Sequence, residues 1–588
     1  MFNITTLSTQ EFHQNAKTFK KEAANFDAAF EPIDNRQRLR AIAYSMLRSM
    51  SVVSQEYYEP FVRKLFGLGY VFTGLPGEML PVDFAIGVDD LRCVVSINAL
   101  LSKNDSLPCI LDPEEEALKT YISSEKRCHV ANIKLLKSKP CDDWDFPISF
   151  PEFIYQVKNY VTFILGEAPD VKSVIAMGRF GPGANTTTKR HTSVRHKLSA
   201  EPGIGHELSP ILREIVGYYP RWLQNVTIPV TPARLTFVPK TMRTHRPIEV
   251  QPLLSGFYQL GVGAFIKHRL KMIGVDLSDQ SKNQRAALRG SLDGSICTID
   301  LQSASDSISV GCVFQLMPDD WLDILSFGRV SKVEFNGTER TLNKWSAMGN
   351  GYTFELETLI FYAISYVTHM MYKLNPSALL VYGDDIVCRS ELFEPLSRVL
   401  RAFGFAVNEK KSFGSGPFRE SCGSDYVLGN DVRPFYVRGT LSREVLTLMH
   451  NFYRAKGWFP LLCAGIASNL NGLVPYGPAK GDGHLHAEDY ACYLEKETHT
   501  IRHGTFKRQS AKNNTPLHND HLWAVFGLDD REFSLFPESS KSYSVRGVRP
   551  FRLRTELVEG RHPVSMAKAY ERFGYQFCKL PHLVYFPV

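Results

Sequence analysis

The order of apolar and polar residues in the middle of the chain predicts alternating helices and strands. Apolar residues recur at helical spacing from Tyr352 to Tyr372, which predicts a helix with a buried face. A second helix is expected over Leu392 to Phe403, with a strand at 405–407 after it. Short β-type runs at 295–299 and 379–388 lie before and between these helices. The pattern therefore favours an α+β sheet layer with helices packed on one face.

The run at 379–388 is interrupted by Tyr382-Gly383-Asp384-Asp385, which predicts a hairpin turn. Glycine at the first central position of a two-residue loop suits a type II′ turn. The turn is expected to hold two adjacent, exposed carboxylates on rigid backbone. Because adjacent acids repel each other, a cation between them would stabilise the pair, so one interpretation is a metal site. The other is a solvated turn, since Gly and Asp are common turn residues.

A third carboxylate upstream favours the metal site. The β run at 295–299 ends in Asp300, so a strand end and the hairpin could bring three acids to one sheet edge. Mg²⁺ prefers such all-oxygen surroundings and keeps positions open for substrate phosphates. Two ions roughly 3.5–4 Å apart can activate an attacking oxygen and stabilise a leaving oxygen at phosphorus. The three acids therefore predict phosphoryl or nucleotidyl transfer.

Two basic stretches upstream suggest a polyanionic ligand. A glycine-rich turn at 178–183 is followed by hydroxyl and basic residues, and it could line a phosphate backbone or be a solvated loop. The stretch 236–246 is predicted to form an extended ribbon carrying Lys240, Arg243 and Arg246. These cations could hold a triphosphate, or the ribbon could be a plain surface hairpin.

The rest of the chain gives weaker signals. The glycine-rich loop 346–351 could let the backbone approach a ligand closely, or it could be a flexible entry to the helix that follows. Residues up to about 170 are expected to be mostly helical. Beyond Tyr436 the chain is expected to be helical again and then irregular, with loops at 469–486 and 501–514.

Composition limits the class of protein. The chain has 588 residues, 44% of them hydrophobic, which indicates a globular protein with several subdomains. Its formal net charge of +7 permits a polyanionic partner without requiring one. Eleven cysteines without a paired CxxC spacing argue against a disulfide framework or a structural zinc, and they fit a reducing cytosol. We expect a soluble protein, since the sequence shows neither a signal peptide nor an apolar run long enough to span a bilayer.

Three blocks of the sequence, in order and spacing, resemble motifs A, B and C of template-directed RNA polymerases. Thr298 to Leu301, with Asp306 downstream, resembles motif A. Ser346 to Gly351 and the helix after it resemble motif B, and Tyr382 to Asp385 resembles motif C.

Longer blocks narrow the resemblance to one family. The segments at 300–307, 348–357 and 416–423 are similar to the replicase β subunit of the single-stranded RNA bacteriophages, the leviviruses. The similarity runs from about Gly178 to Tyr436. It implies an RNA-directed RNA polymerase that replicates a viral single-stranded RNA genome in the cytoplasm of the infected bacterial host.

The resemblance also implies an α+β fold with the right-hand architecture of polymerases. An antiparallel palm sheet would carry the acids, and the fingers and thumb would be largely helical. The expected division is an N-terminal region with part of the fingers at 1–170, fingers at 171–269, palm at 270–440, and thumb with the C-terminal region at 441–588.

Catalytic roles follow from the same resemblance. Asp300 and Asp384 would be the principal ligands of two Mg²⁺ ions, for which Mn²⁺ can substitute, and Asp385 would ligate more weakly or orient the site. The 3′-hydroxyl of the growing RNA would attack the α-phosphate of an NTP and release pyrophosphate. Lys410 or Lys411 occupies the place of a lysine that serves as general acid for the pyrophosphate.

Further residues would bind the nucleotide. Lys240, Arg243 and Arg246 resemble the fingers motif that grips the triphosphate, because guanidinium groups match phosphate oxygens. Ser346, Gly349 and Asn350 belong to the motif B loop beside it; these, like the cations, are expected in the nucleotide site.

Asp306 has two compatible interpretations. With Asn350 it could sense the ribose 2′-hydroxyl, the group that separates ribonucleotides from deoxyribonucleotides. It also lies where an N-cap belongs, if a helix starts near Ser307.

Two other functions are compatible with parts of the sequence. A reverse transcriptase shares the palm and its three acids, although Gly383 and Asp306 favour ribonucleotide synthesis. A non-catalytic RNA-binding protein would explain the basic stretches but would leave three acids near a polyanion unexplained. By resemblance, the expected partners are template and product RNA, NTPs, host translation elongation factors Tu and Ts and a ribosomal protein, with no membrane.

Overall fold

The structure is a computed structural model, and it describes most of residues 35–470. Within that range 75–77, 137–143, 191, 193 and 219–227 lie outside the description. Beyond it the described residues are 474, 476–477, 479 and 484–487, together with the backbone of two short paired strands, β13 (Phe506–Arg508) and β14 (Phe551–Leu553). The predicted loop at 501–514 therefore falls outside the described residues except for β13.

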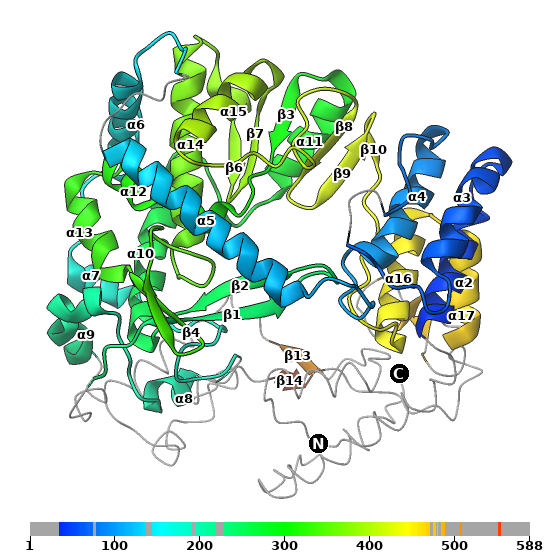
Figure 1. The fold of residues 1–588 in the computed structure, drawn as a ribbon, viewed down its shortest axis with the longest axis horizontal. Helices are drawn as coiled ribbons and strands as arrows, with labels where there is room; N and C mark the ends of the chain where they lie inside the picture. The colour runs from blue at the N-terminus through cyan, green and yellow to red at the C-terminus, as the bar shows by residue number, and fades with distance from the viewer. Residues whose placement is uncertain are drawn as a thin grey trace, which may run out of the picture.

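A three-stranded antiparallel sheet lies at the centre of the fold (Figure 1). Its order is β3-β7-β6, made by β3 (Ile296–Ile299), β7 (Asp385–Arg389) and β6 (Leu380–Tyr382). Ile299 pairs with Ile386, and Tyr382 pairs with Asp385 across the turn. The predicted strand and hairpin are confirmed. The middle strand is apolar in its interior because both of its neighbours and the packed helices exclude water from it.

Two helices predicted from periodicity pack near this sheet. They are α14 (Thr353–Met371) and α15 (Phe393–Ala402), and both contribute buried residues to the same hydrophobic core as the strands. The strand predicted at 405–407 is wrong. Within this segment only Val407 forms a β-bridge, which joins it to Leu301. The pairing ends there because the segment that contains Leu301 turns into the 3-10 helix at 304–306.

A second sheet holds the predicted basic ribbon. Its order is β2-β1-β4-β5. The four strands are β1 (Ala233–Pro239), β2 (His245–Val250), β4 (Lys332–Phe335) and β5 (Thr338–Thr341). β1 and β2 pair antiparallel from Arg234 with Val250 to Pro239 with His245, so the ribbon is extended there, whereas Lys240 and Arg243 lie in the turn between the two strands. The long helix α5 (Pro113–Leu136) crosses this sheet and places Tyr121 in a small core with Ala233 and Val333 (Figure 1).

Segments far apart in the sequence share a second core. The helices α2 (Asn35–Leu47), α3 (Val52–Leu65) and α4 (Gly87–Ser102) pack against α16 (Arg443–Lys456) and α17 (Pro460–Leu470) (Figure 1). By contrast, α6 (Phe150–Leu165) belongs to the core of the central sheet. The packing thus divides the predicted 1–170 region between two cores.

The remaining elements connect these parts. The third sheet, β10-β9-β8, consists of β8 (Phe418–Ser421), β9 (Ser424–Val427) and β10 (Asn430–Asp431). The other helices are α7 (Val171–Ala176), α8 (Val194–Ser199), α9 (Leu212–Tyr218), α10 (Leu253–Met272), α11 (Ser281–Asp293), α12 (Val310–Leu316) and α13 (Asp319–Gly328). The described 3-10 helices are η1 (His206–Ile211), η3 (Ala304–Asp306), η4 (Pro376–Ala378) and η5 (Ser390–Leu392).

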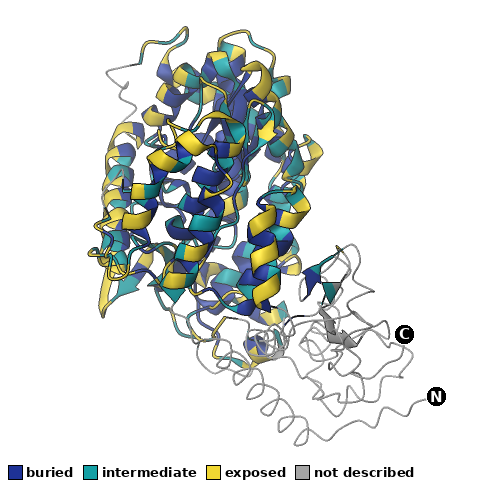
Figure 2. Cartoon of the chain, turned by 90° about the vertical axis from the view of Figure 1, so that its right-hand side faces the viewer, coloured by how far each residue is buried: buried dark blue, intermediate teal, exposed yellow. Residues whose placement is uncertain are grey.

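The mostly helical character expected for the first 170 residues is confirmed where they are described. In the predicted loop at 469–486, α17 continues to Leu470, and β11 (Tyr476–Gly477) pairs with β12 (Leu485–His486). Figure 2 shows buried positions concentrated on the inward faces of the helices. None of the described helices has the length and apolar character needed to cross a membrane.

Candidate active site

Three acids meet at one edge of the central sheet. Asp300 directly follows β3, and Asp385 opens the antiparallel strand β7, so the register Ile299 to Ile386 brings both to the same edge. Asp384 lies in the two-residue turn before β7. The structure thus places all three predicted acids together. They are half-buried, so the expectation of an exposed pair is wrong, because helix α14 packs beneath the turn.

The turn itself has the geometry that its sequence predicts. Gly383 adopts a φ of +63°, whereas Asp384 does not take a positive φ; a type I′ turn would need positive φ at both positions, so type II′ fits. The Gly383 N–H donates to Thr358 Oγ1 at 2.9 Å. A Cβ at Gly383 would come within 2.4 Å of the Phe354 ring, so only glycine allows the turn to dock on α14.

Asp300 is held by a turn that sequence reasoning did not single out. Its N–H donates to Ser412 Oγ at 3.0 Å, and Asn408 Nδ2 donates to its Oδ2 at 2.6 Å. The Lys411 ammonium lies 3.9 Å from the same oxygen; both lysines are exposed, and among the described residues no ion pair joins Lys410 to these acids. Of the two lysines considered as general acid, the structure therefore places Lys411 at the acids.

The negative charges of the acids repel one another, and nearby cations partly offset that repulsion. Burial raises the pKa of Asp384, and the cations Lys411, Arg246 and Lys240 oppose that rise. Burial also raises the pKa of Asp300. For Asp385, burial together with the charges of Asp384, Glu420 and Asp300 raises the pKa to about 7. A divalent cation at this edge would offset that charge.

The donor set suits a hard cation, but its side chains do not form a closed cage. Within the described part of the chain, no three His, Cys, Asp or Glu side chains converge on one point as metal ligands. Asp385 Oδ2 instead accepts a hydrogen bond from the Cys422 N–H at 3.2 Å. All-carboxylate oxygen donors are nevertheless the chemistry that Mg²⁺ prefers, so Asp300, Asp384 and Asp385 all have the donor type that such an ion needs.

The basic ribbon contributes two of its three predicted cations to this site. Lys240 and Arg246 both act electrostatically on Asp384. Arg243 instead forms a salt bridge with Glu78, whose side chain is only 7% exposed, at 3.3 Å. The structure therefore separates Arg243 from the pair that faces the acids.

The glycine loop before α14 packs on the end of the ribbon. The Glu249 N–H donates to Met348 O at 2.9 Å. Gly349 has a φ of +117°, and a Cβ there would come within 2.2 Å of Glu249 O. Glycine at 349 is thus required because the loop packs closely against the backbone of β2. Ser346 is buried, and no hydrogen bond reaches its hydroxyl from the described residues.

Asp306 is not an N-cap. Helix α12 begins at Val310, and Ser309 is its N-cap, with Oγ accepting from the Cys312 N–H at 3.2 Å. The 3-10 turn η3 ends at Asp306 and delays the helix start that was expected near Ser307. The Asp306 carboxylate binds Lys344 Nζ at 2.9 Å instead. Sequence reasoning missed Lys344 because no local pattern relates it to Asp306.

The predicted glycine-rich turn at 178–183 has an internal cation. Buried Lys197 donates through Nζ to the carbonyls of Gly181 at 2.6 Å and Gly183 at 2.7 Å. This lysine therefore orders the loop, while Lys189 and Arg190 are exposed.

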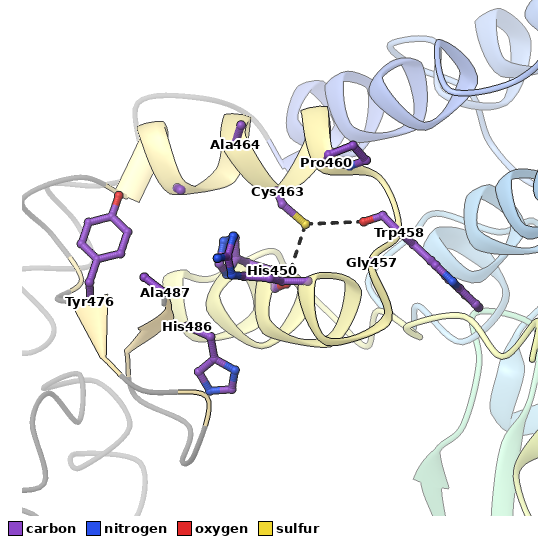
Figure 3. A pocket seen from close by; sticks show the side chains of 11 residues that line it. His450, Gly457, Trp458, Pro460, Cys463, Ala464, Tyr476, His486 and Ala487 are labelled. Carbon is purple, nitrogen blue, oxygen red and sulfur yellow. Dashed lines mark hydrogen bonds between the residues drawn. The ribbon is translucent and has the colours of Figure 1, made fainter. Parts of the chain in front are cut away.

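A cavity of about 440 Å³ lies at α16 and α17, away from the acids (Figure 3). His450, Cys463 and Trp458 are among its lining residues, and the Cys463 thiol contacts backbone oxygens of the other two. Its described lining residues include no carboxylate, so it lacks the chemistry of the sheet edge.

Comparison with known proteins relates this site to one family. The family model described as "RNA replicase, beta-chain" matches residues 75–467, a range that contains the acids, the ribbon and the glycine loop. The chain belongs to this replicase β-chain family.

Individual relatives agree with the family model. The RNA-directed RNA polymerase subunit beta of Escherichia virus Qbeta is 34% identical over 375 residues, 62% of this chain and 62% of that protein. The RNA-directed RNA polymerase beta chain of Escherichia phage MS2 is 43% identical over 221 residues, 38% of this chain and 40% of that one. The similarity to these replicase chains thus spans less than two thirds of their length.

Among solved structures, the RNA-dependent RNA polymerase of a human picorbirnavirus is similar with a TM-score of 0.37 and 13% identity. That match covers 65% of this chain and 73% of the other. A similarity this low supports no conclusion about the function of the chain.

Proposed function

We propose that the chain is an RNA-directed RNA polymerase that copies a viral single-stranded RNA genome from NTPs in the cytoplasm of an infected bacterium. One observation carries the proposal: Asp300, Asp384 and Asp385 share a sheet edge that faces Lys240 and Arg246. Family membership supports it, since relatives that match over part of the chain are named RNA-directed RNA polymerases.

In this proposal the fold is a right hand. The central sheet is the palm, the ribbon and its neighbouring helices belong to the fingers, and α16 and α17 belong to the thumb. The RNA template would lie across the palm, between the fingers and the thumb.

Asp300 and Asp384 would hold two Mg²⁺ ions, or Mn²⁺ in their place, with Asp385 as an auxiliary ligand. When bound, the ions supply activation of the attacking 3′-hydroxyl and charge stabilisation of the leaving pyrophosphate. Asn408 orients Asp300, because its amide donates to Oδ2 at 2.6 Å. Lys411, whose ammonium lies 3.9 Å from Asp300 Oδ2, would give a proton to the leaving group.

The nucleotide would lie between the ribbon and the glycine loop. Lys240 and Arg246 would bind its triphosphate through charge-assisted hydrogen bonds. Ser346, Gly349 and Asn350 would line the sugar side, and Asp306 would accept a hydrogen bond from the ribose 2′-hydroxyl. Arg243, in its pair with Glu78, would support the ribbon from behind.

Partners of the proposed enzyme are template and product RNA, NTPs, and host subunits. By family resemblance the host subunits are translation elongation factors Tu and Ts and a ribosomal protein.

The test is nucleotide incorporation by the purified chain with an RNA template and Mg²⁺, with and without host extract. We expect incorporation from NTPs, loss of synthesis in Asp384→Asn, and retention in Asp323→Asn, which changes an exposed acid on α13. Incorporation from dNTPs alone would indicate a reverse transcriptase. RNA binding without any incorporation, even with extract, would indicate a non-catalytic RNA-binding protein.

A further inference from the structure

The ammonium of Lys344 is enclosed by three carboxylates. The side chain is fully buried. Its Nζ lies 2.9 Å from Asp306 Oδ1, 3.3 Å from Glu249 Oε1 and 3.4 Å from Glu125 Oε1. The same nitrogen lies 3.7 Å from the centre of the Tyr121 ring. We call these five residues the Lys344 node.

The node joins four segments around the proposed nucleotide site. Tyr121 and Glu125 come from α5, Glu249 from β2, and Asp306 from η3. Lys344 itself lies just before the glycine loop. Glu249 also binds the glycine loop, because its backbone N–H donates to Met348 O. Lys344 therefore connects the two segments that would flank the ribose, the one that carries Asp306 and the glycine loop.

Backbone contacts strengthen this connection next to Lys344. The Trp345 N–H donates to Ile308 O at 2.7 Å, and Ser309 forms a β-bridge with Lys344. The segment that leads into the glycine loop therefore runs beside the segment that leaves Asp306. A shift of Lys344 would change their spacing.

Charge in the node keeps Lys344 protonated. Burial acts to lower its pKa, but the charges of Asp306 and Glu249 overcome that effect and hold the pKa well above the ordinary value. Burial raises the pKa of Glu249, and the Tyr121 hydroxyl donates to Glu249 Oε1 at 2.6 Å. The node can therefore be stable although acids outnumber the cation.

Lys344 leaves one oxygen of Asp306 available. It binds Oδ1, whereas no side chain or backbone group in the described part of the chain hydrogen-bonds to Oδ2. The Asp306 side chain keeps 10% exposure. A hydroxyl donor could reach Oδ2 without breaking the ion pair, and the pair would fix where that acceptor stands.

We propose that Lys344 is a positioning residue for nucleotide selection: it orients Asp306 so that the free oxygen accepts the ribose 2′-hydroxyl and the enzyme prefers NTPs to dNTPs. This inference rests on the proposed polymerase function. A site built around such an acceptor rejects the analogue that lacks the hydroxyl, because its polar group is then unpaired.

The test compares Lys344→Met and Lys344→Arg with the wild type in the full chain. The measured quantity is the ratio of kcat/KM for an NTP to kcat/KM for its 2′-deoxy analogue, together with equilibrium binding of the two nucleotides. Methionine matches the length of the stem without the charge. We expect the ratio to fall about tenfold or more in Lys344→Met, with an intermediate value in Lys344→Arg.

Leu446→Ala serves as the control for loss of stability, since Leu446 is buried in the second core, away from the node. Its ratio should equal that of the wild type even if its melting temperature drops as far as that of Lys344→Met. If Lys344→Met does not fold, Lys344→Arg decides: its planar group cannot reproduce the ammonium contact, so a fall of about threefold or more supports the proposal.

A wild-type ratio in folded Lys344→Met, or in Lys344→Arg where only that variant folds, overturns the inference while leaving the polymerase proposal intact. A wild-type chain that incorporates neither nucleotide, even with host extract, overturns both. The two failures are therefore distinguishable.

Discussion

The ammonium of Lys411 lies 3.9 Å from Oδ2 of Asp300, at the edge where β3 ends. The contact is loose enough for the lysine to move, since its side chain is 57% exposed. Asn408 holds the same carboxylate oxygen at 2.6 Å, so Asp300 stays in place when Lys411 leaves it. The arrangement suits a proton donor that approaches the reacting phosphates rather than a structural cation.

Lys411→Met should therefore lower the rate of NTP incorporation at least about tenfold, because general acids contribute factors of that size or larger. Lys410→Met, at the exposed neighbouring position, is the matched control and should retain the wild-type rate. Single-turnover kinetics across a pH range measure both. Equal losses in the two variants would contradict the assignment to Lys411.

Neutralising one of the clustered acids should stabilise the protein while it damages synthesis. Asp385→Asn removes a half-buried charge that lies among Asp384, Glu420 and Asp300, so its unfolding free energy without divalent ions should rise by roughly 1 kcal/mol. Asp323→Asn on the exposed side of α13 should change neither property. Thermal unfolding in EDTA measures the stability of both variants, and an incorporation assay measures their RNA synthesis. A drop in stability for Asp385→Asn would show that its hydrogen bond from Cys422 outweighs the repulsion.

The two arginines of the ribbon should have separable effects. Arg246→Gln should raise the KM for NTP about tenfold or more, since a charge-assisted contact with phosphate is worth roughly 1.5–3 kcal/mol. Arg243→Gln should chiefly lower the melting temperature, because it leaves Glu78 without its 3.3 Å partner. Steady-state kinetics with varied NTP and thermal unfolding separate the two. A similar rise in KM for both variants would place Arg243 at the triphosphate as well.

The glycine loop offers a test of close packing. Gly349→Ala should destabilise the protein by about 1–3 kcal/mol and reduce synthesis, since its Cβ would come within 2.2 Å of Glu249 O. Gly337→Ala is the control: its φ is +75°, but nothing lies within 4 Å of the added carbon. Gly337→Ala should lose only the stability that a positive φ costs an alanine, and it should keep the wild-type activity. Chemical denaturation and incorporation assays measure both, and equal effects would mean that the contact with Glu249 yields easily.

Lys103 should make stability depend on pH in the alkaline range. Burial, with the charges of Arg433, Arg438 and Lys411, lowers its pKa from 10.5 to about 8, although Glu420 opposes the shift. Below pH 8 Lys103 is protonated in both the folded and the unfolded chain, so the cost of burying its charge lowers the stability of the folded state. Between about 8 and 10.5 the unfolded chain binds more protons, so stability from this group rises with pH.

Lys103→Met removes that dependence. Relative to the variant, the wild type should gain about 1 kcal/mol or more between pH 8 and pH 10, since one pKa unit corresponds to roughly 1.4 kcal/mol. Denaturant unfolding at both pH values measures the difference. The Tyr436 ring lies 3.6 Å from the ammonium and favours its charged form, so a constant difference would mean that this contact cancels the burial penalty.

Local sequence patterns determined the elements that carry the site. Periodicity predicted α14 and α15, and the Gly383 turn between two apolar runs predicted the hairpin. These features follow from neighbouring residues alone, because a helix face and a two-residue turn are set by short-range geometry. The sequence motifs also led to the family to which the chain belongs.

Tertiary packing decided what each polar side chain does. One of the two interpretations of Asp306 made it a helix N-cap, but its carboxylate binds Lys344 instead. Arg243 was expected at the triphosphate and pairs with Glu78. Lys411 rather than Lys410 came to lie at Asp300. Chain direction, burial and charge select these partners across tens to hundreds of residues, and no local spacing encodes such distances. The sequence by itself therefore determined the strands that flank the acids, the turn and the acids themselves, whereas only the folded chain decided which cation meets which carboxylate.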